Sequence, residues 1–256
     1  MTFDTQTPIF LITGGSRGLG RAMALGLADK GADVVLTYHA RKEDAAGVVS
    51  EIEAKGRTAA ALQLDTGDMA SFTRFETQLG QTLGETWGTD TITGLVNNAG
   101  IGINTPIAET SEAQFDQLMN MHLKGVYFLT QTLLPRIADN GRILNISSGL
   151  ARFSYAGFSA YAMMKGGIEV FTRYLALELG SRGISVNTIA PGAIETDFGG
   201  GLVRDNEEMN AAIAGNTPLG RVGLPEDIGG AVAAMLTSDT RWINGERIEV
   251  SGGIHH

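Results

Sequence analysis

The sequence predicts an α/β fold: one doubly wound parallel sheet of about seven strands, with helices on both faces. Two observations support this prediction. Short apolar segments alternate along the chain with longer segments of helical periodicity, which is the rhythm of β-α-β units. The short segments are continuously apolar, as expected for strands that are buried on both faces of a parallel sheet.

The expected elements follow one another in a regular order. Strands are predicted at residues 8–13, 33–38, 58–64, 93–97, 142–147, 184–190 and 247–251. Helices are predicted near residues 18–30, 42–55, 68–83, 111–137, 158–180 and 225–237. No repeat, low-complexity tract or linker interrupts this order, so we expect a single domain.

Two segments do not fit the alternation. Residues 80–93 are polar and rich in Gly and Thr, and we expect them to form a surface loop before the fourth strand. Residues 193–220 form an irregular stretch with three consecutive glycines at 199–201. Because a connection of this length in a compact domain is usually functional, it is predicted to be a lid over a substrate.

Composition and charge exclude several classes of protein. Of the 256 residues 43% are hydrophobic, enough for a sizeable core, and the net charge of −9 disfavours nucleic acid as a partner. The chain has no cysteine, so disulfides and thiolate metal sites are impossible, and no metal site is predicted. No apolar run approaches the roughly 18 residues that span a bilayer, and the N-terminal segment lacks the basic start of a signal peptide. We therefore expect a cytoplasmic protein with no membrane partner.

A glycine-rich segment directly follows the first expected strand and opens the first helix. It runs Thr-Gly-Gly-Ser-Arg-Gly-Leu-Gly over residues 13–20. Glycines let the backbone approach a pyrophosphate closely, and a helix N-terminus presents free N–H groups and a positive dipole end to it. The spacing G-x-x-x-G-x-G differs from the commoner dinucleotide spacing G-x-G-x-x-G, so an ordinary turn is the alternative. The residues predicted to hold a dinucleotide here are Gly14, Ser16, Arg17, Gly18, Leu19 and Gly20.

Tyr161 and Lys165 are four residues apart on an expected helix, so both side chains lie on one face. A phenol has an ordinary pKa of roughly 10, and a nearby cation lowers that pKa toward the range useful for proton transfer. Ser148 stands at the carboxyl end of an expected buried strand, where its hydroxyl could donate to a substrate oxygen. A Tyr-x-x-x-Lys pair alone is more typical of a helix surface, but its place shortly after Ser148 favours catalysis. The glycines that follow, Gly166 and Gly167, suggest that another backbone or a cofactor packs closely there.

Taken together, these segments resemble the classical short-chain dehydrogenase/reductase family. The resemblance rests on the glycine loop, the Asn-Asn-Ala-Gly segment at 97–100, Ser148 with Tyr161 and Lys165, Pro-Gly at 191–192, segments 220–223 and 225–227, and Gly-Gly at 252–253. Within the family the chain looks most like 3-oxoacyl-carrier-protein reductases and carbonyl reductases. The resemblance implies a Rossmann fold and a single dinucleotide-binding and catalytic domain over residues 1–256. It also implies hydride transfer between a nicotinamide cofactor and a ketone or secondary alcohol, with Tyr161 as general acid or base.

The helix before the fifth strand departs from the family pattern. Many members carry an Asn where this chain has His122, and that Asn is thought to position a water that relays protons to the lysine. Because a histidine can both donate and accept hydrogen bonds, His122 is predicted to take part in catalysis at this position. Asn120 lies about 200° away round a helix and cannot substitute directly. The alternative is a histidine packed in the interior without a role.

NADP(H) is the expected cofactor, with NAD(H) as the alternative. An acid at the end of the second strand would select NAD by accepting from the ribose hydroxyls, but Tyr38 stands there and no acid occurs before Glu43. Arg17, helped by Arg41 or Lys42, is placed to meet a 2′-phosphate, unless the latter two are only the solvated first turn of a helix. The resemblance implies further cofactor contacts from Tyr38, His39, Arg41, Asp65, Thr66, Asn98, Ala99, Gly100, Tyr161, Lys165, Pro191, Gly192, Ile194 and Thr196.

The expected substrate pocket is walled by residues 149–159 and covered by residues 193–220. Phe153, Tyr155 and Phe158 make the wall largely aromatic, and the alternative is that these side chains pack under a loop. No cluster of arginines on either segment is present in the sequence to hold a carboxylate or phosphate. A neutral small-molecule ketone, or a thioester whose charge lies far away, fits better than a small keto acid.

Two other functions remain open at this point. One is an NADP-binding module that senses the redox state without turnover, and the complete set of Tyr161, Lys165 and Ser148 argues against it. The other is a nucleotide-sugar epimerase or dehydratase. The short region after Pro191 leaves little room for the sugar-binding part that such an enzyme needs.

A homotetramer or a dimer is expected. The family resemblance suggests that helices 111–137 and 158–180 pair across a two-fold axis. The second helix carries an apolar stripe made of Met164, Ile168, Phe171 and Leu175. The alternative is that this stripe is buried against the chain's own sheet.

Overall fold

Seven strands form one sheet in the order β3-β2-β1-β4-β5-β6-β7 in the computed structural model, which describes residues 7–254. Every neighbouring pair is parallel. The order reverses between β1 and β4, and open sheets of this kind bind ligands beyond the carboxyl ends of their strands at such a point. The predicted doubly wound α/β fold is confirmed. The strands are β1 (Ile9–Ile12), β2 (Asp33–Tyr38), β3 (Ala59–Gln63), β4 (Ile92–Asn97), β5 (Ile137–Ile146), β6 (Ser185–Pro191) and β7 (Arg247–Val250).

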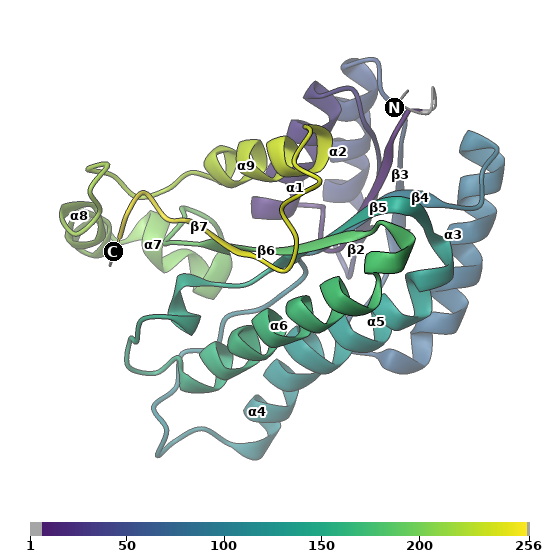
Figure 1. The fold of residues 1–256 in the computed structure, drawn as a ribbon. Coiled ribbons are helices and arrows are strands. Elements are labelled where there is room, and N and C mark those ends of the chain that lie inside the picture. Colours follow the sequence, from purple (N-terminus) through teal and green to yellow (C-terminus); the bar gives the residue numbers. More distant parts are fainter. Residues whose placement is uncertain (1–6, 255–256) are drawn as a thin grey trace.

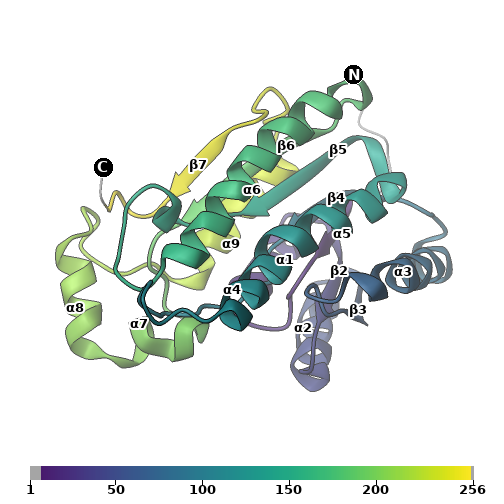
Figure 2. The same ribbon diagram turned by 90° about the horizontal axis from the view of Figure 1, so that it is seen from below.

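Helices cover both faces of the sheet (Figure 1). One layer consists of α1 (Gly18–Asp29), α2 (Lys42–Ala54) and α9 (Pro225–Thr237), and the other of α3 (Phe72–Trp87), α5 (Gly125–Leu133) and α6 (Ser159–Glu178). Figure 2 shows α5 and α6 running next to each other under the sheet. Each layer shares its own apolar core with the strands, which are buried on both faces as their sequence predicts.

Helix α3 continues to Trp87, so the prediction of a surface loop over residues 80–93 is wrong for its first half. Phe72, Phe75, Leu79 and Leu83 form one buried stripe on this helix, and that burial outweighs the low helix propensity of Gly80 and Gly84. At Gly80 a Cβ would lie 2.7 Å from the guanidinium of Arg136, which explains the glycine. The helix ends where Gly88 adopts a φ of 66°, the left-handed conformation common after a helix.

The single helix predicted over residues 111–137 is broken into several pieces. Helix α4 (Glu112–Met119) is followed by a π-helical turn at Asn120–Lys124, by α5 and by a 3₁₀ turn at Leu134–Arg136. A Cβ at Gly125 would lie 2.0 Å from the Thr66 carbonyl oxygen, so the chain passes close to the turn after β3 here. Strand β5 then begins at Ile137, five residues before its predicted start at residue 142. The π-helical turn holds His122, and such turns are frequent at functional sites.

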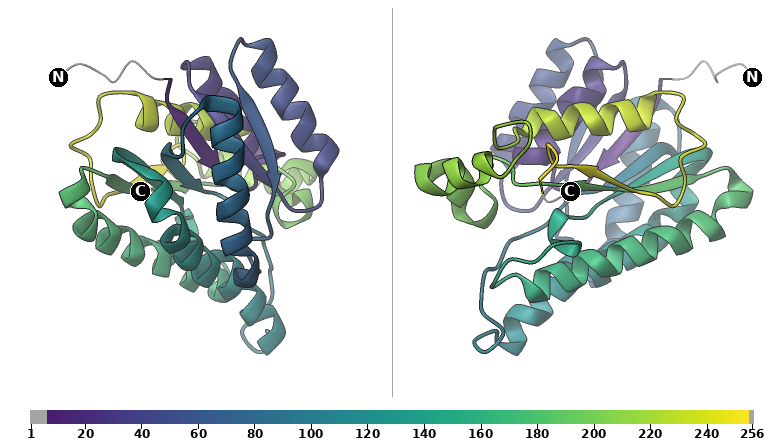
Figure 3. Two further views of the ribbon diagram at one scale, coloured as in Figure 1. Left: turned by 90° about the vertical axis from the view of Figure 1, so that its right-hand side faces the viewer. Right: turned by 60° about the vertical axis from the view of Figure 1, so that its left-hand side comes forward.

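Residues 193–220 are more regular than predicted, because they contain α7 (Leu202–Asp205) and α8 (Glu207–Gly215). The three glycines before α7 have φ values of 61°, 79° and 80°, a conformation that other residues rarely adopt. Figure 3 shows both helices standing apart from the two layers that cover the sheet. The segment therefore projects as a separate flap, and its role as a lid stays a prediction.

Among residues 7–254 no helix is long and apolar enough to cross a membrane. The same described residues contain no group of three or more His, Asp or Glu side chains arranged to hold a metal ion.

Candidate active site

The glycine loop forms a cradle between β1 and the N-terminus of α1. Gly14 and Gly18 have φ values of 66° and 53°, which favour glycine. A Cβ at Gly20 would lie 2.1 Å from the Gly14 carbonyl oxygen, so the loop closes tightly on the helix. Arg17 precedes α1 without a side-chain cap, so no cap competes with an anion for the first N–H groups of the helix. These residues fit the pyrophosphate of a dinucleotide.

The end of β4 supports this cradle from behind. The Asn98 side-chain amide donates to the carbonyl oxygens of Thr13 and Gly14, at 2.9 Å and 3.2 Å. The backbone N–H groups of Asn98 and Ala99 both donate to the Thr13 hydroxyl, at 2.9 Å and 3.0 Å. In the structure, then, two of the residues predicted to contact the cofactor hold the glycine loop in position.

Tyr161, Lys165 and Ser148 meet at the carboxyl end of β5, where α6 presents the first two. Tyr161 and Lys165 are buried, with 6% and 5% of their surface exposed. The Lys165 ammonium donates to the Ile146 carbonyl at 2.7 Å and lies 5.6 Å from the centroid of the Tyr161 ring. The Ser148 side chain is hydrogen-bonded to the Tyr161 phenol and accepts from the Leu150 N–H at 3.2 Å. The structure thus brings these three predicted residues to one point.

Burial controls the protonation of this pair. It raises the pKa of Tyr161 above its ordinary value by more than the hydrogen bond with Ser148 lowers it. Burial also lowers the pKa of Lys165 to about 7. The net shift of the Tyr161 pKa is upward because burial dominates, and the lowering by Lys165 stays a prediction. The phenol is therefore protonated at neutral pH, which suits a proton donor.

The two glycines after Lys165 differ from each other. A Cβ at Gly167 would lie 2.9 Å from the Leu123 side chain, so the close neighbour is a side chain of the π-helical turn. At Gly166 a Cβ would meet no described protein atom within 4 Å. No other backbone of the described chain lies close to either glycine, and the alternative of a closely packed cofactor stays a prediction.

His122 lies beside Tyr161. Its ring centroid is 5.1 Å from that of Tyr161 in an edge-to-face arrangement, and 1% of its surface is exposed. Its Nε2 lies 2.7 Å from the Ile101 carbonyl oxygen, whereas Nδ1 is buried without a partner in the described structure. Burial, followed by the charge of Lys165, lowers the pKa of His122 to about 3. His122 is therefore a neutral imidazole whose Nδ1 is unused among the described residues; Nε2 lies near both the carbonyl oxygen and the N–H of Ile101, so the tautomer decides whether Nδ1 donates or accepts.

This buried histidine predicts a pH dependence of stability. Between about pH 3 and pH 6.5 the unfolded chain binds a proton on His122 that the folded chain does not bind, so stability is lost as the pH falls. From about pH 7 to pH 5 the free energy of unfolding of the wild type should fall by about 2 kcal/mol more than that of His122→Asn. Chemical denaturation at both pH values measures this, with the exposed His39→Asn as control. The prediction is refuted if the free energy of unfolding falls equally between pH 7 and pH 5 for the wild type and for His122→Asn.

The start of the 193–220 segment connects the glycine loop with Tyr161. Arg17 donates to Asp197 at 3.0 Å, and the Phe198 ring centroid lies 5.6 Å from that of Tyr161. The guanidinium of Arg204, and then that of Arg17, hold the pKa of Asp197 below its usual range. Arg17, predicted to hold a 2′-phosphate, is thus engaged by an anion of the protein itself.

At the carboxyl ends of β2 and β3, Tyr38 is half-buried against the core of the first layer. His39 is exposed, with its Nε2 3.6 Å from the Asp65 carboxylate. Arg41 forms an ion pair with Asp44 at 3.2 Å. His39 and Asp65 therefore lie together, while Arg41 contacts the first turn of its own helix.

The end of β6 carries the remaining predicted contacts. Pro191 is buried as the last residue of this strand, and a Cβ at Gly192 would lie 2.9 Å from the Cα of Ser251. Ile194 forms an isolated parallel bridge with Gly223. This end of the sheet faces the same side as the glycine loop, since a Cβ at Gly18 would lie 3.8 Å from the side chain of Thr196.

Three features of the site escaped the sequence analysis: Asp197, Phe198, and an ion-pair network around Arg247. Nothing in the sequence links Asp197 to Arg17. The sequence could have indicated Phe198, because an aromatic residue directly before the three glycines of the expected lid is placed to contact a substrate. A signal also existed for Arg247, because two charged residues alternate with two apolar ones in a short strand.

The fold and the site have the parts of a dinucleotide-dependent oxidoreductase, and the comparisons with known proteins agree. The family described as enoyl-(acyl carrier protein) reductase matches residues 14–255. 3-oxoacyl-[acyl-carrier-protein] reductase FabG of Vibrio harveyi is 36% identical over 254 residues, which cover 98% of this chain and 99% of FabG. Hydroxynaphthalene reductase-like protein Arp2 of Metarhizium brunneum is 33% identical over 270 residues, covering 99% of each chain. The crystal structure of angucycline C-6 ketoreductase LanV with bound NADP is 34% identical, with a TM-score of 0.91 over 96% of this chain and 95% of LanV.

The chain therefore belongs to the short-chain dehydrogenase/reductase family and is an oxidoreductase by family.

Proposed function

We propose that this protein is an NADPH-dependent ketoreductase in which Tyr161 donates the proton to the substrate oxygen. The observation that carries the proposal is the buried phenol of Tyr161, which meets Ser148 and Lys165 at the edge of the sheet that also holds the glycine cradle. Bound NADP in the ketoreductase LanV supports the same cofactor for this chain.

Each side chain has a definite task in this reaction. The reduced nicotinamide supplies the hydride when the cofactor is bound. Ser148 donates a hydrogen bond to the carbonyl oxygen as negative charge develops there, and Tyr161 gives its phenolic proton to the same oxygen. Lys165, with a pKa of about 7, can then donate toward the tyrosinate that remains. His122, whose Nδ1 has no partner in the described structure, can accept a hydrogen bond in the chain that restores the proton.

The cofactor is held in our proposal by the predicted set of glycine-loop, β2, β4 and β6 residues. Gly14, Gly18 and Gly20 receive the pyrophosphate on the N-terminus of α1. Arg17 binds the 2′-phosphate after leaving Asp197, which makes NADPH the preferred cofactor.

The surroundings of Tyr161 favour a neutral ketone with an aromatic body. The Phe198 and Phe158 ring centroids lie 5.6 Å and 6.4 Å from that of Tyr161, and Phe153 and Tyr155 contact each other edge to face at 6.0 Å. Offset or edge-to-face packing on such rings stabilises an aromatic ligand. The similar protein Arp2, a hydroxynaphthalene reductase-like protein, is consistent with this class.

The test is NADPH consumption with a panel of neutral aryl ketones, aliphatic ketones, an acyl thioester and a small keto acid. Steady turnover of an aryl ketone with little turnover of the keto acid is the expected result. Turnover of any ketone excludes the redox-sensing module, and turnover without a sugar nucleotide excludes the epimerase or dehydratase. Tight NADPH binding with no turnover across the panel would reject the proposed reaction.

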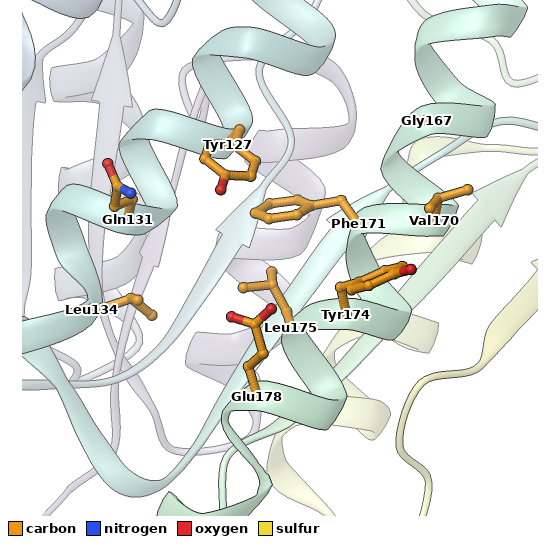
Figure 4. Close-up of a pocket in the computed structure, with 9 residues that line it drawn as sticks. All are labelled: Tyr127, Gln131, Leu134, Gly167, Val170, Phe171, Tyr174, Leu175 and Glu178. Atoms are coloured by element: carbon orange, nitrogen blue, oxygen red, sulfur yellow. The ribbon is translucent and has the colours of Figure 1, made fainter.

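We also propose that the outer face of α5 and α6 binds a second copy of this chain. The predicted stripe is not the exposed part of this face: Met164 and Ile168 are buried within the chain, as the alternative stated, while Phe171 and Leu175 line a hollow in the face. The outer face instead exposes other large apolar side chains and a hollow of about 360 Å³ between the two helices (Figure 4). Those side chains are Tyr127, Phe128, Met163, Val170, Tyr174 and Leu177.

Light scattering should therefore give a particle of two or four times 27.0 kDa at micromolar concentration. Leu177→Glu places a charge on the most exposed residue of this face, 79% exposed, and should shift the particle toward the single chain. Leu219→Glu, at a 72% exposed leucine outside this face, is the matched control and should leave the mass unchanged. A wild-type mass of one chain would defeat the proposal.

A further inference from the structure

A partly buried ion-pair network lies directly behind the active site. The Arg247 guanidinium, at the start of β7, donates through Nε to Glu169 at 2.6 Å and through Nη1 to Glu249. Its third nitrogen, Nη2, donates to the backbone carbonyl of Ser148 at 3.3 Å. Arg247 thus joins two carboxylates and the backbone of a residue that the proposed reaction uses.

The same network also contacts the helix that carries Tyr161 and Lys165. Glu169 lies on α6 one turn after Lys165, and its carboxylate accepts from the Ser147 hydroxyl at 2.7 Å. The Ser147 hydroxyl in turn lies 3.3 Å from the Lys165 carbonyl oxygen. Arg247 therefore connects the strand end that holds Ser148 with the helix that holds the proton donor.

The burial of these charges argues against a loose surface contact. The side chains of Arg247, Glu169 and Glu249 are 21%, 16% and 10% exposed. Taking charges out of water is unfavourable unless the geometry satisfies them, and a guanidinium can do so because its donors are fixed in one plane. Burial alone would lower the pKa of Arg247, but the hydrogen bonds that it donates to Glu249 and Glu169 outweigh burial and raise that pKa. The guanidinium is therefore permanently charged and held in one orientation.

We infer that Arg247, fixed between Glu169 and Glu249, is a positioning residue for Ser148: it sets where the Ser148 hydroxyl stands relative to the Tyr161 phenol. This inference rests on the proposed function. Arg247 touches no reacting atom in this account, and it acts by holding the backbone carbonyl of Ser148 and the α6 carboxylate at a fixed separation. Small displacements of a hydrogen-bond donor from the reacting oxygen can lower the rate about 100-fold.

The test uses Arg247→Lys. Lysine keeps the positive charge but has one nitrogen in place of the three that contact Glu169, Glu249 and the Ser148 carbonyl. We expect kcat for the ketone to fall roughly 10- to 100-fold, while the dissociation constant of NADPH, measured by fluorescence titration, changes less than about twofold. Glu169→Gln, which keeps the shape of the side chain and weakens the same junction, should lower kcat in the same direction. It provides a second variant if Arg247→Lys folds poorly.

The matched control is Arg136→Lys. Arg136 also joins a carboxylate and a backbone carbonyl, donating to Glu76 at 2.6 Å and to the Asp90 carbonyl at 3.2 Å, with 25% of its side chain exposed. It lies at the opposite end of β5, before the strand begins. Arg136→Lys should lower the melting temperature to a similar extent and leave kcat unchanged.

A double-mutant cycle with Ser148→Ala separates positioning from general structural damage. If Arg247 acts through Ser148, Arg247→Lys should lower kcat by no more than about twofold in the Ser148→Ala background. The inference is overturned if Arg247→Lys lowers kcat equally in the wild-type and Ser148→Ala backgrounds. It is also overturned if Arg247→Lys lowers kcat no more than Arg136→Lys does. In both cases the proposed function stands. A wild type that reduces no ketone defeats the proposed function first, and the inference with it.

Discussion

Replacing Tyr161 with Phe is expected to lower kcat for ketone reduction by about 100- to 10,000-fold, the usual contribution of a positioned general acid. In the proposed reaction the phenol is the proton donor, and burial raises its pKa, which keeps it protonated. Phenylalanine keeps the buried ring and its contacts with His122 and Phe198, so the fold should survive. The dissociation constant of NADPH should therefore change little, and kinetics combined with a binding titration measure both quantities.

Tyr174→Phe is the matched control for this variant. It removes a tyrosine hydroxyl from the same helix, at a position that is 61% exposed, and keeps the ring on the outer face of α5 and α6. Its kcat should equal that of the wild type. Retention of more than a few per cent of the wild-type kcat by Tyr161→Phe would show that another group supplies the proton.

The strands could be predicted closely because continuous burial gives each of them an uninterrupted apolar run. Strand β2 has the predicted bounds, and β6 differs from its prediction by one residue at each end. The errors lie where tertiary contacts override local propensity. Leu83 is fully buried in α3, so the helix continues through glycines that appear to end it in the sequence. The π-helical turn around His122 has no periodicity that a sequence pattern could show.

The proximity of Tyr161 and Lys165 could be predicted because one turn of helix fixes the relation between them. The directions of their pKa shifts could not, because both depend on burial that only the folded chain creates. Contacts between residues far apart in the sequence could not be predicted either. Arg17 and Asp197 are 180 residues apart, and Arg247 and Ser148 are 99 residues apart.

The second large effect concerns the cofactor. Arg17 adjoins the cradle that receives the pyrophosphate, and Tyr38 at the end of β2 presents no negative charge to a 2′-phosphate. A charge-assisted contact with a phosphate contributes about 1.5–3 kcal/mol, or roughly 10- to 150-fold in affinity. Because Arg17 is half exposed and paired with Asp197, we expect the lower end of that range. Arg17→Ala should raise the Michaelis constant for NADPH roughly 10-fold and leave that for NADH nearly unchanged.

Two further variants follow from the same geometry. Asp197→Asn removes the competing anion, so it should lower the Michaelis constant for NADPH by about two- to fivefold. Tyr38→Asp places a carboxylate where the ribose hydroxyls of NADH can use it and the phosphate cannot, so it should reverse the preference. Arg21→Ala is the matched control, since Arg21 lies one turn further along α1 and pairs with Glu51 at 2.6 Å.

The experiment compares these variants with both cofactors at fixed salt, because screening weakens contacts between exposed charges. If Arg17 contacts the 2′-phosphate directly, Arg17→Ala should raise the Michaelis constant for NADPH and Arg21→Ala should leave it unchanged. If both arginine variants raise the Michaelis constant equally, the effect is one of net charge around α1 and Arg17 does not bind the phosphate. If the unmodified enzyme already prefers NADH, the prediction fails at once, and His39 or a backbone group at the end of β2 must then contact the ribose.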